Sequence, residues 1–250
     1  DYDGAASSPL KGHHVVEIPD GLRVGIVGYM GLDASLVAPF KVPVWFSHTM
    51  SDETCTSSTD CSSGSCLDGL CTAAPVQDHA AHMPALIEDV AQAVRDVRAR
   101  DVDLVVALAH AGLSTREVEA IIAGEMDPGD ATASEDILVA YGVEAALLDE
   151  GIPGIDVIVS GHSHSLVSEP LVIPSPAGDG RNVYIVQAGD YGRHVGRLEV
   201  FRDDVDEPWQ VDLDASGPIP VDDTVDTSGL TLGLTSMMDE AITGVMDAVE

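Results

Sequence analysis

Three histidines follow two apolar runs of the chain, and imidazole is a common ligand of transition metals. The first run, residues 155–160, leads into the sequence Gly-His-Ser-His, so that His162 and His164 follow it directly. The second run, residues 102–109, leads into His110. Residues i and i+2 of an extended backbone point to the same side, which predicts that the rings of His162 and His164 face one pocket. Neutral imidazole binds zinc, manganese and iron, so the pattern predicts a metal centre.

The elements that must position these histidines alternate between helix and strand. Residues 83–100 have apolar side chains at helical spacing and precede the apolar run at residues 102–109. Residues 135–150 form another predicted helix and precede the apolar run at residues 155–160. Helices that alternate with almost entirely apolar strands predict an α/β fold, in which helices cover a sheet. Ligands of such sheets bind at the carboxyl ends of the strands, where all three histidines are expected.

Several shorter elements complete the predicted sheet. A Pro-Asp-Gly turn joins two of the strands, which is typical of a hairpin. Ser114 begins a short helix and has Glu117 three residues on, as in a capping box. We predict strands at residues 15–18, 23–28, 171–173, 183–187 and 196–201, a helix at 114–123 and a last helix at 230–249.

The composition limits the class of protein and its partners. The chain has 250 residues, 45% of them hydrophobic, which predicts one domain with insertions. It has 11 Lys and Arg against 43 Asp and Glu, a net charge of −32, so its surface repels nucleic acid and anionic membranes. An anionic substrate would need local cations, which bound metal would supply. No apolar stretch approaches the roughly 18 residues of a membrane span. The first residues lack a signal peptide, so we expect the chain to begin after processing or within a longer protein.

All four cysteines lie close together in a segment rich in serine, threonine and glycine. They are Cys55, Cys61, Cys66 and Cys71. A zinc ribbon would prefer Cys-x2-Cys pairs, so we favour two disulfides that stabilise an insertion at residues 50–75. Three pairings are possible, and the sequence does not choose among them. Disulfides predict an extracytoplasmic protein that is secreted, periplasmic or on the cell surface.

Four ordered segments carry a family resemblance. Residues 105–112 contain a strand followed by His-x-Gly, and residues 161–164 contain Gly-His-x-His. Together with residues 21–28 and 187–198, these segments resemble the calcineurin-like metallophosphoesterases, in particular the 5′-nucleotidase branch. The resemblance covers about residues 15–201, interrupted by the cysteine insertion.

The resemblance implies a fold, a reaction and a set of cofactors. The fold would be a layered sheet flanked by helices, and the reaction would be hydrolysis of a nucleotide or another phosphate ester. Two divalent metal ions (zinc, manganese, iron or magnesium) would activate a bridging water and neutralise charge on the phosphate. Carried over residue by residue, His110 and His162 would bind one metal ion and His164 would bind the other.

The sequence also departs from the family. The family's earlier motifs supply its other metal ligands and its catalytic histidine. Of these, Asp-x-His and Gly-Asn-His do not occur in the sequence, and no Gly-Asp precedes residues 105–112. The family's C-terminal specificity domain is also missing. We therefore predict a partial domain, in which residues 1–215 are the C-terminal part of a catalytic domain and residues 216–250 are a linker. The missing N-terminal and C-terminal parts would belong to the same protein, and this chain alone would be inactive.

Two other interpretations stay open. The chain could be a secreted structural or adhesive protein on a catalytically inactive phosphoesterase fold, with the cysteine loop as its interaction module. It could also keep both metals and act on a cyclic nucleotide, a nucleotide sugar or a sulfur ester. For His194 we favour a surface or supporting role. Arg193 and Arg197 could meet a phosphate, but pairing with carboxylates is the favoured expectation.

Overall fold

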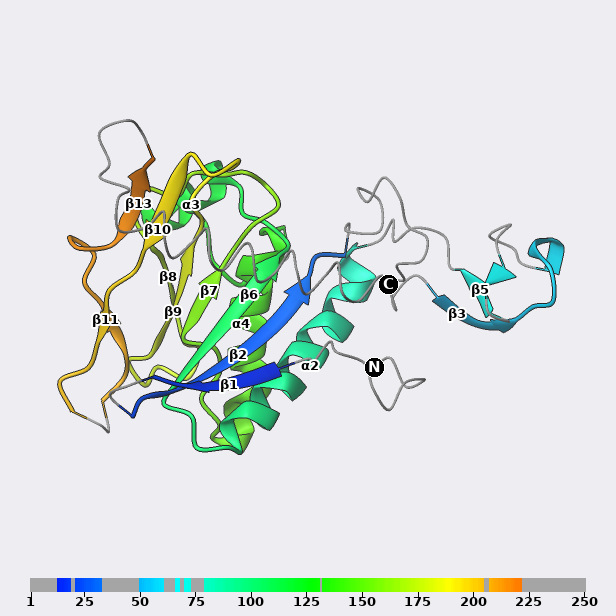
Figure 1. Cartoon of the computed structure of the whole chain (residues 1–250), viewed down its shortest axis with the longest axis horizontal. Coiled ribbons are helices and arrows are strands. Elements are labelled where there is room, and N and C mark those ends of the chain that lie inside the picture. Colours follow the sequence, from blue (N-terminus) through cyan, green and yellow to red (C-terminus); the bar gives the residue numbers. More distant parts are fainter. Residues whose placement is uncertain are drawn as a thin grey trace, which may run out of the picture.

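The sheet that bears the histidines is parallel at its centre. The computed structural model describes residues 13–18, 21–32, 50–60, 66–67, 70–72, 79–130, 132–204 and 207–221. Its central strands are β2 (Arg23–Met30), β6 (Leu104–His110), β7 (Val157–Val159) and β9 (Asn182–Val186), in that order. All four run in the same direction, so their carboxyl ends meet at one edge (Figure 1). The predicted α/β fold is confirmed, and its sheet is largely parallel.

Each edge of this sheet is an antiparallel strand. β1 (His13–Glu17) pairs with β2 and forms the predicted hairpin. β8 (Leu171–Pro174) pairs with β9 at the other edge. Both strands begin or end within a few residues of their predicted bounds, because alternating and continuous apolar patterns are strong signals for strands.

The main helices pack against each other and against one face of the sheet (Figure 1). They are α2 (His79–Arg98) and α4 (Glu135–Leu147), which continues into η3 (Leu148–Glu150). The short helix α3 (Thr115–Ile122) follows β6. Ser114 is its N-cap residue as predicted, but Glu117 accepts a hydrogen bond from Ser134 Oγ, so no capping box forms. Within the described residues, no helix is both long enough and apolar enough to cross a membrane.

The core lies between these helices and the sheet face that they cover. A row of aligned, fully buried side chains crosses that face from β2 to β9: Val27, Ala107, Ile158 and Ile185. One residue further along, Leu108 and Val159 point to the other face, where they are 52% and 42% exposed. The prediction that helices cover the sheet is therefore correct for one face among the described residues.

Two short antiparallel ribbons follow β9. β10 (His194–Arg197) pairs with β13 (Gly217–Pro220), and β11 (Val200–Phe201) pairs with β12 (Gln210–Val211). The single strand predicted at residues 196–201 was wrong, because the chain changes its partner strand between β10 and β11. β13 lies within residues 216–250, the region predicted as a linker, and it pairs with β10. The helix predicted at residues 230–249 lies outside the described residues.

The cysteine segment contains regular structure. It has the strands β3 (Met50–Thr54), β4 (Cys66–Leu67) and β5 (Leu70–Thr72), which form a small antiparallel sheet, and the turn η2 (Ser58–Asp60). Cys55 is buried and disulfide-bonded. The side chains of Cys61, Cys66 and Cys71 lie outside the description, so the predicted two-disulfide arrangement stays a prediction.

A buried ionic network joins the helices to the amino ends of the strands. Arg98 at the end of α2 donates to Asp156 Oδ2 at 2.7 Å, just before β7. Arg181, just before β9, donates to Asp156 Oδ1 and to Glu144 Oε2 of α4, each at 3.0 Å. Asp156 also accepts a hydrogen bond from the backbone N–H of Val105 at 2.7 Å. This network fixes the amino ends of the strands, opposite the edge that bears the histidines.

Glu144 gives this network a pH dependence. Burial raises the pKa of its carboxyl, although the positive charge of Arg181 opposes the shift. The folded chain therefore holds a proton that the unfolded chain releases above its ordinary pKa of about 4.3. The stability contributed by Glu144 is full below that pH and is lost as the pH rises through the raised pKa. Urea unfolding from about pH 4 to about pH 8 should show wild type losing stability relative to Glu144→Gln. A difference that stays constant with pH would contradict this assignment.

Candidate metal centre

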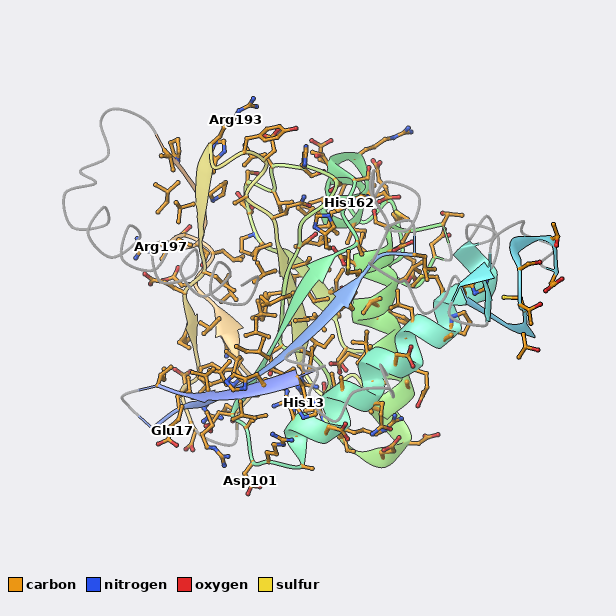
Figure 2. The ribbon with its side chains drawn as sticks, turned by 45° about the vertical axis from the view of Figure 1, so that its right-hand side comes forward. His13, Glu17, Asp101, His162, Arg193 and Arg197 are labelled. Carbon is orange, nitrogen blue, oxygen red and sulfur yellow. The ribbon has the colours of Figure 1, made fainter. Side chains whose placement is uncertain are left out.

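The three predicted histidines lie at the carboxyl edge of the parallel sheet. His110 is the last residue of β6, and His162 and His164 lie in the turn after β7. Figure 2 shows His162 near the end of the strands. Because β6 and β7 are adjacent and parallel, the two strand ends bring His110 and His162 together. The edge is the one where open α/β sheets bind ligands.

His110 and His162 present two ring nitrogens to each other. His110 Nε2 lies 3.3 Å from His162 Nδ1, and the ring planes meet at 66°. Two nitrogens bound to one tetrahedral metal ion at about 2.0–2.1 Å lie about 3.3–3.4 Å apart. The same spacing suits a hydrogen bond in which one ring donates its N–H to the other. The separation of the two nitrogens is therefore compatible with two ligands of one metal ion and with a hydrogen bond between the rings.

The turn that holds His162 and His164 has an unusual backbone. Their φ angles are +79° and +58°, in the left-handed region that costs side-chain-bearing residues energy. The prediction that an extended backbone directs both rings into one pocket was therefore wrong, because β7 ends at Val159 and the turn is not extended. Such strained residues gather at functional sites, where the surrounding structure holds them in place.

Gln187, the residue after β9, holds this turn in place through hydrogen bonds. Its buried side-chain amide accepts hydrogen bonds from the backbone N–H groups of His164 and Ser165, both at 3.2 Å, and donates to Ser163 Oγ at 3.0 Å. Ser163 Oγ in turn accepts the backbone N–H of Leu113 at 3.0 Å. The turn is thus held from both neighbouring strand ends.

Two glycines allow the close approach of the strand ends. A Cβ on Gly161 would lie 3.2 Å from Nδ1 of His110, and a Cβ on Gly112 would lie 3.1 Å from the Cβ of Ser163. Gly112 also has a φ of +98°, which favours glycine. Glycine at both positions leaves room for the His110 ring beside the Gly-His-Ser-His turn.

A buried aspartate joins the two histidine-bearing segments. Asp136, in the first turn of α4, is fully buried and accepts a hydrogen bond from the backbone N–H of Gly112 at 3.1 Å, two residues after His110. It also accepts one from Ser160 Oγ, two residues before His162, and one from Tyr29 Oη at 2.7 Å. Burial raises the pKa of the Asp136 carboxyl, although these hydrogen bonds oppose the shift.

His164 faces a different set of groups. Its Nδ1 lies 3.7 Å from Asp190 Oδ2, and its ring meets that of Tyr191 edge-on at 5.2 Å. Arg193 pairs with Asp190 at 3.2 Å, and Arg197 pairs with Glu199. The expectation that these two arginines pair with carboxylates is confirmed.

The structure therefore divides the predicted three-histidine cluster into two places. His110 and His162 are together, whereas His164 lies with Asp190. Within the described ranges, no three His, Cys, Asp or Glu side chains lie close enough to hold one metal ion. The metal-binding role of all three histidines stays a prediction.

Sequence reasoning missed Asp136, Gln187 and Asp190. Asp136 lies in the first turn of a helix, where an acidic residue is ordinary, so no local signal distinguishes it. Gln187 and Asp190 belong to a segment that shows the family resemblance, but nothing in that pattern assigned them a contact.

No family model matches this chain, and no curated protein matches it. Among solved structures, the sulfate thiohydrolase SoxB of Thermus thermophilus, in complex with glycerol, is similar with 18% identity and a TM-score of 0.41. The match covers 86% of this chain and 26% of that one, so this chain spans about a quarter of its length. The likeness is distant and concerns the arrangement of helices and strands alone.

Proposed function

We propose that this chain is part of a metal-dependent hydrolase that cleaves phosphate esters, with a nucleotide as its substrate. The observation that carries the proposal is the 3.3 Å separation of His110 Nε2 and His162 Nδ1. The position of this pair at the carboxyl edge of the sheet supports a ligand site. The ordered segments that resemble the calcineurin-like metallophosphoesterases support the same reaction class.

The residues present fit part of the proposed centre. His110 and His162 would hold one divalent ion as neutral imidazoles, and His164 with Asp190 would contribute to a second. Described residues supply fewer ligands than two ions need. We propose that the remaining ligands come from other parts of the same protein. When bound, such ions provide a hydroxide nucleophile at neutral pH and offset the charge that develops on a phosphoryl group.

The chain's own residues orient the ligands and limit their movement. Gln187 and Asp136 hold the two histidine-bearing segments in a fixed relation, so the ring nitrogens need little reorganisation to bind. Arg193 is largely exposed beside Asp190, so its guanidinium would pair with a bound phosphate. Cations near the site would also offset the repulsion between an anionic substrate and a surface with net charge −32.

We also propose an extracytoplasmic location. The support is the disulfide at Cys55, since disulfides persist in oxidising compartments.

The test of this function is hydrolysis of adenosine 5′-monophosphate by the complete, metal-loaded protein. We expect His162→Ala to lower kcat/KM by about 10³-fold or more, the scale of losing a principal electrostatic stabiliser. His14→Ala is the matched control, because His14 is exposed on the edge strand β1, and it should leave the rate unchanged. Equal rates for wild type and His162→Ala would overturn the proposal. A cyclic nucleotide, a nucleotide sugar and a sulfur ester, assayed in parallel, identify the ester class.

The alternative is a structural or adhesive protein on an inactive phosphoesterase fold. The observation that favours it is that no group of three ligands occurs among the described residues. A complete protein that folds, binds less than one metal ion per chain and hydrolyses none of these esters would establish the alternative.

A further inference from the structure

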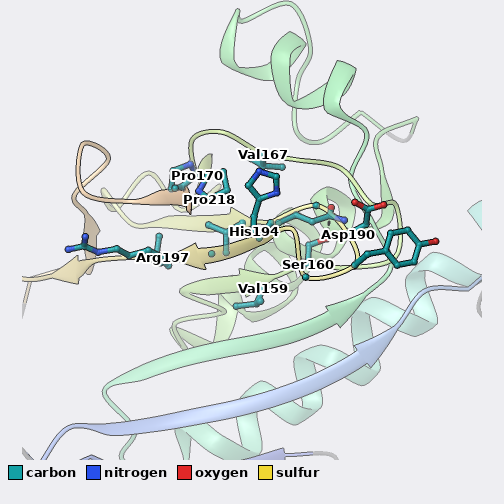
Figure 3. A pocket seen from close by; sticks show the side chains of 17 residues that line it. Val159, Ser160, Val167, Pro170, Asp190, His194, Arg197 and Pro218 are labelled. Carbon is teal, nitrogen blue, oxygen red and sulfur yellow. Dashed lines mark hydrogen bonds between the residues drawn. The ribbon is translucent and has the colours of Figure 1, made fainter. Parts of the chain in front are cut away.

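A cavity of about 350 Å³ lies beside the proposed metal centre, between the ends of β7 and β9 and the β10–β13 ribbon (Figure 3). Val159 and Val186 form its floor on the uncovered face of the sheet, and Pro218 of β13 lines the ribbon side. Ligand sites have volumes of about 300–1,000 Å³, so this cavity has room for one small organic group.

Two residues connect this cavity to the proposed centre. Asp190 lines the cavity and lies 3.7 Å from His164 Nδ1. Tyr191 also lines the cavity, and its ring meets that of His164 edge-on. Tyr191 is 81% exposed and has a φ of +52°, a backbone conformation that costs energy in residues with a side chain. A molecule that reaches His164 would therefore contact the cavity as well.

The walls favour an uncharged group. They are largely apolar, with Val167, Pro170 and Leu198 among them. The charged residues of the lining, Asp190 and Arg197, already have partners of opposite charge.

One residue of the lining, His194, has a ring nitrogen without a hydrogen-bond partner among the described residues. This nitrogen, Nδ1, is buried. Leaving such a group unpaired costs about 1–3 kcal/mol, and His194 lines the cavity, so a small rotation of its ring would let a bound molecule pair with this nitrogen.

We propose that this cavity binds the leaving group of the ester, as an uncharged aromatic ring with a hydrogen-bonding atom that pairs with His194. The proposal rests on the proposed function, because the phosphate of the same ester would lie at the histidines. An exposed aromatic at the border, apolar walls and one unpaired ring nitrogen are the features that such a ring requires.

The experiment titrates the full chain, without metal, with phenol and follows the imidazole signals by NMR. The His194 signal is assigned by its loss in His194→Gln. We expect it to shift saturably in wild type and in the control Val195→Thr, whose exposed side chain does not line the cavity. Gly196→Val should weaken phenol binding about tenfold or abolish it, because Gly196 lines the cavity and a Cβ there has room, with its nearest neighbour Ala188 Cβ at 3.5 Å.

The outcomes separate this proposal from the proposed function. If Gly196→Val misfolds, Ala188→Leu fills the same cavity from another wall and should weaken phenol binding similarly. The absence of a saturable shift in wild type, or an equal shift in the filled variants, would overturn the subsite. Because phenol binding requires neither metal nor hydrolysis, a failure of the metal centre would leave this result unchanged.

Discussion

Replacing Arg181 with methionine should destabilise the chain by about 3–5 kcal/mol, the range for breaking a buried ion pair from one side. Arg181 donates to Glu144 and to Asp156, and these two carboxylates are only 6% and 4% exposed. Without Arg181, Asp156 keeps Arg98, but Glu144 loses the cation whose charge opposes the rise of its pKa. Methionine fills a similar volume, so the loss reports the charge rather than a cavity.

Urea unfolding at neutral pH measures this prediction. The matched control is Arg197→Met, because Arg197 is largely exposed and pairs with the exposed Glu199. Surface ion pairs contribute about 0–1 kcal/mol, so the control should unfold nearly as wild type does. A loss below about 1 kcal/mol in Arg181→Met would mean that the network does not fix the amino ends of the strands.

Replacing Asp136 with alanine should weaken metal binding at His110 and His162 by about 10–100-fold, the usual effect of removing a group that orients metal ligands. The variant removes a side chain that bonds to both histidine-bearing segments, through Gly112 N–H and Ser160 Oγ. It also leaves buried donors without their acceptor, at a cost of about 1–3 kcal/mol each. Both metal affinity and stability should therefore fall.

Tyr29→Phe distinguishes orientation of the ligands from general damage to the core. It removes the third hydrogen bond of Asp136 and keeps both bonds to the histidine-bearing segments. We expect Tyr29→Phe to lower stability by about 1 kcal/mol with little change in metal affinity. Calorimetric zinc titration of the three proteins decides the question. Equal zinc affinity in wild type and Asp136→Ala would refute the orienting role.

The sheet could be predicted from the sequence because its signals are local. β6 and β7 are apolar runs, and α2 has apolar side chains at helical spacing, so each element was recognisable in its own residues. The prediction that His110 and His162 lie near each other rested on neighbouring strands: His110 ends β6, His162 lies in the turn after β7, and these strands are adjacent and parallel.

The features that the sequence did not predict depend on contacts between distant segments. The left-handed turn at His162 depends on Gln187 and Leu113, which are far away in the sequence. The division of residues 196–201 into β10 and β11 depends on partner strands near the end of the described chain. Neither the turn at His162 nor the division into β10 and β11 produces a periodic pattern in the local sequence, so neither could be predicted from it.

The central claim is that His110 and His162 bind one divalent ion together, and zinc titration of the full chain by calorimetry tests it most directly. We predict weak binding of one zinc ion by wild type, loss of that binding in both His110→Ala and His162→Ala, and its retention in the control His14→Ala. Release of protons on binding would accompany it, because the imidazoles must be neutral to bind. Wild-type binding that persists in both alanine variants, or no binding by wild type, would contradict the claim.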